Sequence, residues 1–132
     1  MKQKASGCFQ RAATVGLNGD QTCVTTMNTA FRQRHDFVVA GLNAIPGISC
    51  RPGAGTFYAF ADVSGAMRAL GLKDDNAFAE YLLVEGGVAV VPGSGFGAPG
   101  HMRISFACSM EMLEDALRRI ERVLKVAVAK RA

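Results

Sequence analysis

Two stretches in which apolar residues recur at the spacing of an α-helix constrain this fold most. One runs from about Gln21 to Ala44 and the other follows Ser109, which can cap it. Charged residues fall on the other faces of both, so each predicts an amphipathic helix that buries one stripe. The apolar positions are Val24, Met27, Phe31, Val38, Leu42 and Ile45 in the first, and Leu113, Ala116, Leu117, Ile120, Val123, Leu124 and Ala127 in the second.

Short strands are predicted between these helices. Residues 48–51 and 56–61 are rich in β-branched and aromatic side chains, and Pro52-Gly53-Ala54-Gly55 separates them, which favours an antiparallel hairpin. Residues 88–91 predict a short buried strand, and residues 102–107 another after the glycine-rich loop at 92–100.

Shorter helices complete the pattern. A helix over about 9–17 ends at Asn18-Gly19-Asp20, where the glycine can take the left-handed C-cap conformation and the acid can open the next helix. Residues 64–70 predict one or two helical turns. Asp74-Asp75 caps a helix that runs through Glu85 and stops at Gly86-Gly87. The expected fold is α+β, a two-layer domain in which amphipathic helices pack on a small sheet of short strands.

Composition narrows the class of protein. A chain of 132 residues with 49% hydrophobic and 20% charged residues is long enough for one domain with a real core. No apolar run approaches the ~20 residues of a membrane span, and polar residues follow the basic start where a leader peptide needs an apolar segment. We therefore expect an intracellular, cytoplasmic protein with no membrane partner.

The cysteines and histidines do not predict a metal site. Cys8, Cys23, Cys50 and Cys108 are scattered without a C-x-x-C pair, so reduced packing thiols are favoured, although an even count also allows disulfides. His35 and His101 lie far apart in sequence, and a lone histidine is more often a surface or capping residue than a ligand.

The formal charge of +4 raises a nucleic-acid hypothesis, but the pattern argues against it. Acidic residues share the last helix with the basic ones, with the acids toward its start and the bases toward its end, as the helix dipole favours. A solvated helix face explains this arrangement better than a nucleic-acid surface.

Two glycine-rich segments resemble functional motifs, but their sequence context does not support a dinucleotide-binding site or a nucleophile elbow. Residues 95–100 match G-x-G-x-x-G, but a strand follows where a dinucleotide fingerprint must open a helix. Ser94 in Gly93-Ser94-Gly95 lacks the glycine spacing of a nucleophile elbow. A tight turn between strands is the better interpretation of both.

Arg103 is the one candidate binding residue. Strand alternation places Arg103 and Ser105 on one face and Met102, Ile104 and Phe106 on the other. A guanidinium on a rigid strand suits bidentate capture of a carboxylate, although a surface salt bridge would explain an isolated arginine equally well.

Four motifs in series then carry a resemblance that covers about residues 9–124. They are Gly41-Leu42-Asn43-Ala44-Ile45-Pro46-Gly47, Gly55-Thr56-Phe57-Tyr58-Ala59-Phe60, Gly87-Val88-Ala89-Val90-Val91-Pro92-Gly93-Ser94-Gly95-Phe96-Gly97 and Met102-Arg103-Ile104-Ser105-Phe106-Ala107. In this order they resemble the carboxy-terminal part of class I, fold-type I aminotransferases, and bacterial aspartate aminotransferases most. The resemblance implies that residues 1–19 are an N-terminal extension and the end of the interdomain helix, and that residues 20–132 are the small domain.

The resemblance also implies roles. Arg103 would bind the α-carboxylate of an amino acid or 2-oxo acid. Phe57 and Phe60 would line the cleft, although core packing explains them equally well, and no role follows for Phe96. In the family the Schiff-base lysine and most groups that hold pyridoxal phosphate lie in the preceding large domain, which also forms most of the homodimer contact. None of the five lysines, Lys2, Lys4, Lys73, Lys125 and Lys130, has such a context.

The expected function is thus that of a small domain which binds a carboxylate and closes over the active site of a pyridoxal-phosphate enzyme, without catalytic or cofactor-binding residues of its own and inert alone. The alternative is a stand-alone α+β binding module with an acidic or nucleic-acid partner. The sequence cannot distinguish an aminotransferase small domain from a fragment of that family with a purely structural role.

Overall fold

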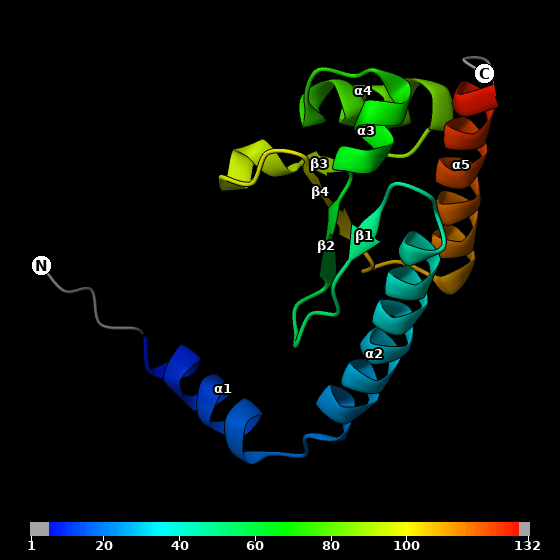
Figure 1. Cartoon of the computed structure of the whole chain (residues 1–132). Coiled ribbons are helices and arrows are strands. Elements are labelled where there is room, and N and C mark those ends of the chain that lie inside the picture. Colours follow the sequence, from blue (N-terminus) through cyan, green and yellow to red (C-terminus); the bar gives the residue numbers. More distant parts are fainter. Residues whose placement is uncertain (1–5, 130–132) are drawn as a thin grey trace, which may run out of the picture. The chain divides into compact units, whose positions relative to one another are not determined.

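The computed structural model describes residues 6–129 and divides the chain into two compact units, one ending at Ala30 and one beginning at Phe31. Their elements appear in Figure 1. Helix α2, Thr22–Asn43, begins in the first unit and continues into the second.

The first unit contains α1, Gly7–Asn18, and the beginning of α2. The predicted left-handed cap at Gly19 is wrong, because this glycine is extended, with φ −81° and ψ −169°. Asp20 does open the next helix, since its carboxylate accepts hydrogen bonds from the backbone N–H and the hydroxyl of Thr22. Val24 and Met27, expected in the buried stripe, are exposed, because nothing within this unit packs against them.

A four-stranded antiparallel sheet organises the second unit, in the order β1-β2-β4-β3. The bounds are β1 Ser49–Cys50, β2 Tyr58–Asp62, β3 Val91–Pro92 and β4 His101–Ser105. The β1–β2 hairpin is confirmed. The predicted buried strand at 88–91 is corrected: the N–H of Val88 bonds to Leu82 at the exit of a helix, and pairing with β4 starts only at the exposed Val91.

The helices of the second unit confirm the predicted segments. They are the rest of α2, α3 Ser64–Leu70, α4 Asp75–Gly86 and α5 Met110–Ala129. The carboxylate of Asp74 caps α4 by accepting from the N–H of Ala77 at 2.8 Å, and Gly87 ends it in the left-handed conformation, with φ +65°. The hydroxyl of Ser109 accepts from the N–H of Met112 at the start of α5.

The core lies on one face of the sheet. Side chains of α2, α4 and α5 pack there against inward-facing residues of β2 and β4. The largest fully buried residues are Phe78, Phe106, Leu42, Leu82, Met102, Ile120, Val38 and Val63. Within the second unit, Gly41 of α2 lies so close to α5 that a Cβ at this position would meet the side chain of Leu117. The α+β class is confirmed, and Ala127 of the predicted stripe lies outside the residues whose side chains are described.

Candidate carboxylate-binding site

The site is built on the second face of the sheet, here called the open face and defined by Tyr58, Phe60, Asp62, Val91, His101, Arg103 and Ser105. Strand alternation produces it as predicted: Met102 is 1% and Ile104 4% exposed in the core, whereas Arg103 between them is half-buried on the opposite face. The backbone register places Phe60 of β2 and Val91 of β3 directly beside Arg103. The guanidinium of Arg103 therefore lies in the middle of the open face of the sheet.

Two aromatic rings hold the guanidinium of Arg103. Its Cζ lies 4.6 Å from the ring centroid of Phe96 and 5.1 Å from that of Tyr58. An aromatic face attracts a guanidinium, and the five N–H donors of the guanidinium lie in one plane, where they can meet a carboxylate. The arrangement restricts the side chain and leaves its hydrogen-bonding edge available for a carboxylate.

Arg103 has no acidic partner among residues 6–129: the ion pairs found there involve other side chains. Asp62 shares the open face but lies opposite His101 in the register. Ser64 donates hydrogen bonds to the Asp62 carboxylate from its hydroxyl and its N–H, which keeps the pKa of Asp62 below its usual range. The carboxylate of Asp62 is thus already engaged, and within the described residues Arg103 does not form the surface salt bridge that could have explained it.

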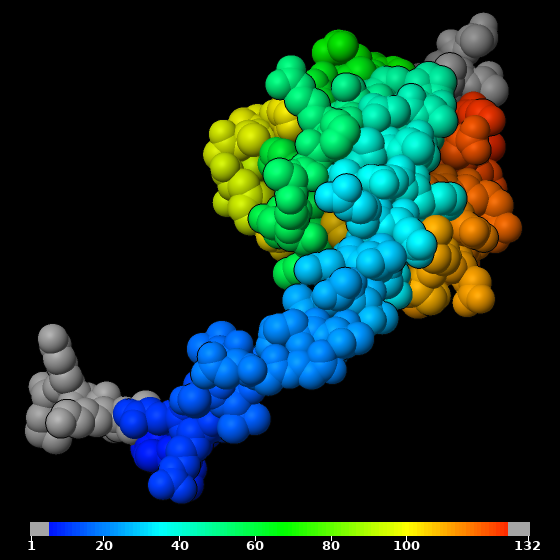
Figure 2. Space-filling model, turned by 90° about the horizontal axis from the view of Figure 1, so that it is seen from below, coloured from blue at the N-terminus to red at the C-terminus, as the bar shows by residue number. Residues whose placement is uncertain are grey.

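Phe96 reaches Arg103 because of a tight turn. The 3₁₀ helix η1, Gly93–Phe96, follows β3 and ends at Gly97 in the left-handed conformation, with φ +74°. The N–H of Gly97 donates to Ser94 and that of Ala98 to Gly93, at 3.0 and 3.1 Å. This turn, in yellow, lies at the surface in Figure 2.

The predicted aromatic residues have different surroundings. Phe60 lies on the open face, stacked on the ring of His101 at 5.3 Å and edge-on to Phe96 at 6.2 Å. Phe57 is exposed and packs edge-on against Tyr58. Whether either lines a substrate cleft stays a prediction, but both belong to the aromatic cluster around Arg103.

Sequence reasoning missed Tyr58 and Phe96 as neighbours of the guanidinium. Phe96 carried a signal, since it is the only large side chain in Gly93-Ser94-Gly95-Phe96-Gly97 and precedes the strand that holds Arg103. Tyr58 needed the β2–β4 register, which pairs it with Ser105.

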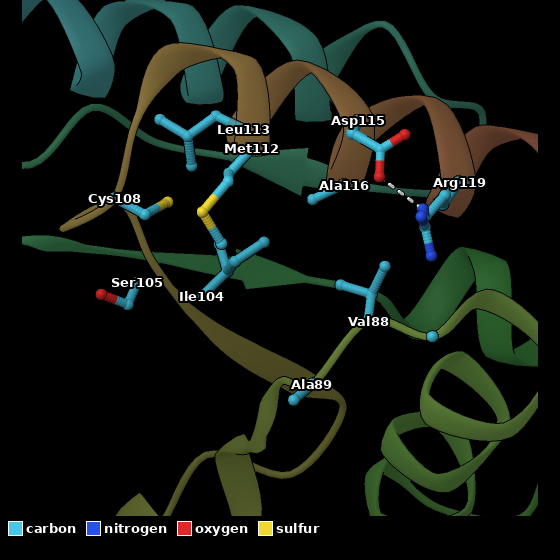
Figure 3. Close-up of a pocket in the computed structure, with 11 residues that line it drawn as sticks. Val88, Ala89, Ile104, Ser105, Cys108, Met112, Leu113, Asp115, Ala116 and Arg119 are labelled. Carbon is cyan, nitrogen blue, oxygen red and sulfur yellow. Dashed lines mark ion pairs between the residues drawn. The ribbon is translucent and has the colours of Figure 1, made fainter.

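Residues of β4, α5 and the segment 87–89 line a pocket of about 320 Å³, which shares Ser105 with the open face (Figure 3). Apolar side chains such as Val88, Ile104 and Leu113 line it, and its charged residues, Asp115 and Arg119, pair with each other. Arg103 is not among its lining residues. With its arginine already neutralised, this pocket is a poorer carboxylate site than the open face.

Two of the five lysines, Lys73 and Lys125, lie among the described residues. Lys73 and Lys125 are exposed and paired with Asp74 and Glu121, and the open face carries no lysine. Lys2, Lys4 and Lys130 lie outside the described residues.

The remaining candidate ligands are the histidines, cysteines and acidic residues. No cluster of His, Cys, Asp or Glu suited to a metal occurs between residues 6 and 129. Cys8, Cys23, Cys50 and Cys108 are unpaired, and burial raises the pKa of the Cys50 thiol. None of the helices in the described part of the chain could cross a membrane.

The sequence matches known proteins over most of its length. The family described as aminotransferase class I and II matches residues 3–120. An aspartate/prephenate aminotransferase of Nitrosomonas europaea is 46% identical over 121 residues, which cover 87% of this chain and 30% of the relative. The aspartate aminotransferase of Bacillus subtilis is 40% identical over 116 residues, covering 88% and 30%.

Solved structures agree with these matches. The aspartate aminotransferase of Rhizobium meliloti superposes with a TM-score of 0.81 at 42% identity and covers 88% of this chain and 30% of its own. An alanine aminotransferase of Pyrococcus furiosus gives 0.81 at 34% identity, with coverage of 87% and 29%. The chain thus spans about 30% of the length of these relatives.

Proposed function

The chain belongs to the family of class I and II aminotransferases, and on this premise we propose that it is the C-terminal small domain of a pyridoxal-phosphate-dependent aminotransferase resembling aspartate aminotransferases. In this proposal residues 20–132 form the domain, and the preceding residues are an extension and the end of the interdomain helix. Its task is to bind the α-carboxylate of an amino acid or 2-oxo acid and to close over the active site.

The observation that carries the proposal is the unpaired guanidinium of Arg103. It is half-buried, oriented by two rings and without an acidic partner in the described part of the chain. A cation in such a place is expected to have an anionic partner, which residues 6–129 do not supply. A substrate carboxylate fits the fork of donors of a guanidinium.

The binding free energy of a single contact indicates why the domain needs the rest of a larger protein to bind its substrate. A charge-assisted hydrogen bond contributes about 1.5–3 kcal/mol, whereas a millimolar complex requires about 4 kcal/mol. Arg103 alone should therefore bind carboxylates with a Kd of roughly 10–100 mM. Within a closed active site the same contact would orient the substrate and help exclude water.

The rest of the enzyme would supply the catalytic groups. Pyridoxal phosphate provides the carbanion chemistry when bound, and the proposal assigns its Schiff-base lysine to the large domain, so this chain alone is inactive. The large domain would be its partner, within a homodimer. The proposal places the enzyme in the cytoplasm, where its unpaired cysteines stay reduced.

Kinetics of Arg103→Leu in the full-length aminotransferase that contains this stretch test the proposal. Losing the carboxylate contact should lower kcat/KM by roughly 10- to 150-fold, mainly through a higher KM. Arg122→Leu is the matched control, because Arg122 is exposed on α5 and its loss removes the same charge. Equal kcat/KM values for the two variants would refute the role of Arg103.

A further inference from the structure

We propose that Asp75 is a positioning residue for the carboxylate site: its buried carboxylate anchors the turn that holds Phe96 against the guanidinium of Arg103. The inference rests on the proposed function only in assuming that this guanidinium must be oriented to bind a carboxylate.

Asp75 is an unusual buried charge. It is the first residue of α4 and is only 2% exposed, although aspartate is almost never fully buried without a partner. The helix does not need it as an N-cap, because Asp74 already accepts from the N–H of Ala77. The carboxylate of Asp75 instead reaches another element, where its Oδ2 accepts a hydrogen bond from the N–H of Ser94 at 2.6 Å.

This bond fixes one end of η1. The first N–H groups of any helix lack a partner within the helix, and Asp75 supplies one for Ser94. The charge is also favourably placed at the N-terminus of α4, where the helix dipole stabilises an anion. Gly97 and Ala98 close the other end of the turn by donating to Ser94 and Gly93. The backbone that carries Phe96 is therefore held at both ends.

Phe96 depends on this anchoring more than a core residue would. Its side chain is 51% exposed, and its ring contacts include the guanidinium of Arg103 and the ring of Phe60. Few contacts hold such a ring, so its place follows from the backbone beneath it. An arginine has large rotamer freedom, which contacts with the rings of Phe96 and Tyr58 restrict. Release of the turn should therefore free the guanidinium.

The position of the guanidinium can be measured in the 132-residue chain by the NMR signal of the Nε–H group of Arg103. The nearby rings of Phe96 and Tyr58 should displace this signal from that of an exposed arginine, and Asp75→Ala should move it to the value found for Phe96→Leu. Asp75→Asn, which keeps an acceptor of the same shape, should restore most of the displacement. Asp74→Ala is the matched control, because it removes the cap of the same helix but leaves the bond to Ser94 intact.

A titration with sodium acetate tests whether the position of the Arg103 guanidinium affects carboxylate binding. Asp75→Ala should weaken acetate binding about two- to fivefold, the value of one cation–π contact at an exposed site. Because Asp75 acts through Phe96, adding Asp75→Ala to Phe96→Leu should produce no further weakening. Additive losses in the double variant would overturn the inference.

One readout needs no variant. The amide proton of Ser94 should be protected from exchange with solvent by its bond to Asp75, and fast exchange at Ser94 would contradict that bond. The two proposals fail differently. If the parent chain binds no acetate but Asp75→Ala alone displaces the Arg103 signal, the positioning stands and the proposed function fails. If acetate binds and Asp75→Ala changes neither signal nor affinity, the positioning fails and the proposed function stands.

Discussion

Replacing Gly93 by alanine tests whether close packing sets the turn beside Arg103. A Cβ at Gly93 would lie 2.4 Å from the carbonyl oxygen of Ala98 and 2.7 Å from the Cβ of His101. Ordinary contacts begin near 3.4 Å, so the turn and β4 would have to separate by about 1 Å. Overpacking of this kind costs about 1–3 kcal/mol, and we expect Gly93→Ala to lower the free energy of unfolding by that amount.

Urea unfolding measures this loss. With a slope of ~1–3 kcal/mol/M, the midpoint should fall by roughly 1 M. Gly95→Ala is the matched control in the same turn, because no atom lies within 4 Å of its added Cβ and its backbone is not left-handed. We expect this control to change the stability by less than about 1 kcal/mol. Equal midpoints for the two variants would refute the packing argument.

Two further predictions concern charge and cofactor. Hydrogen bonds from Ser64 lower the pKa of Asp62 in the folded chain below its unfolded value of ~3.9. The ionised carboxylate therefore stabilises the fold above that pH, and this contribution is lost as the pH falls toward the folded pKa. Asp62→Asn should therefore be less stable than the parent at pH 7 and should lose less stability on acidification. Urea midpoints at pH 7 and pH 3 measure this difference. Equal losses in the parent and the variant would contradict the lowered pKa of Asp62. The purified chain should show no cofactor absorbance in the visible range and should transfer no amino group from aspartate to a 2-oxo acid. A cofactor that copurifies with the chain as a lysine imine would place the Schiff-base lysine here.

Local patterns predicted the elements whose signals lie within one segment. Residues 64–70 became α3 with the predicted bounds, and Asp74 caps α4 as its position before an apolar stripe indicates. The alternation of Met102, Arg103 and Ile104 between the two faces needed only the period of a strand.

Other features depend on contacts that a local pattern does not contain. Val24 and Met27 have the helical spacing of a core stripe, yet periodicity cannot tell whether a partner covers that stripe within the chain. Residues 88–91 are apolar enough for a buried strand, but their pairing depends on where α4 ends.

The site shows the same limit. The face on which Arg103 lies was predictable from the alternation of its strand, whereas its carboxylate-binding role comes from the family resemblance and stays a prediction. Its contacts with Tyr58 and Phe96 arise from the register of β2 and from the path of η1, and the bond from Ser94 to Asp75 joins residues 19 positions apart. Only the folded chain brings these groups together.

The most direct measurement is a titration of the isolated chain with sodium acetate, followed at the Nε–H signal of Arg103, with sodium chloride added to keep the ionic strength constant. If the guanidinium binds carboxylates, the signal should move along a saturating curve with a Kd of roughly 10–100 mM, as one charge-assisted contact allows. Arg122 should show no such curve, since its exposed side chain lacks the flanking rings. Identical, unsaturated responses of the two arginines would contradict the assignment of Arg103 as the carboxylate-binding residue.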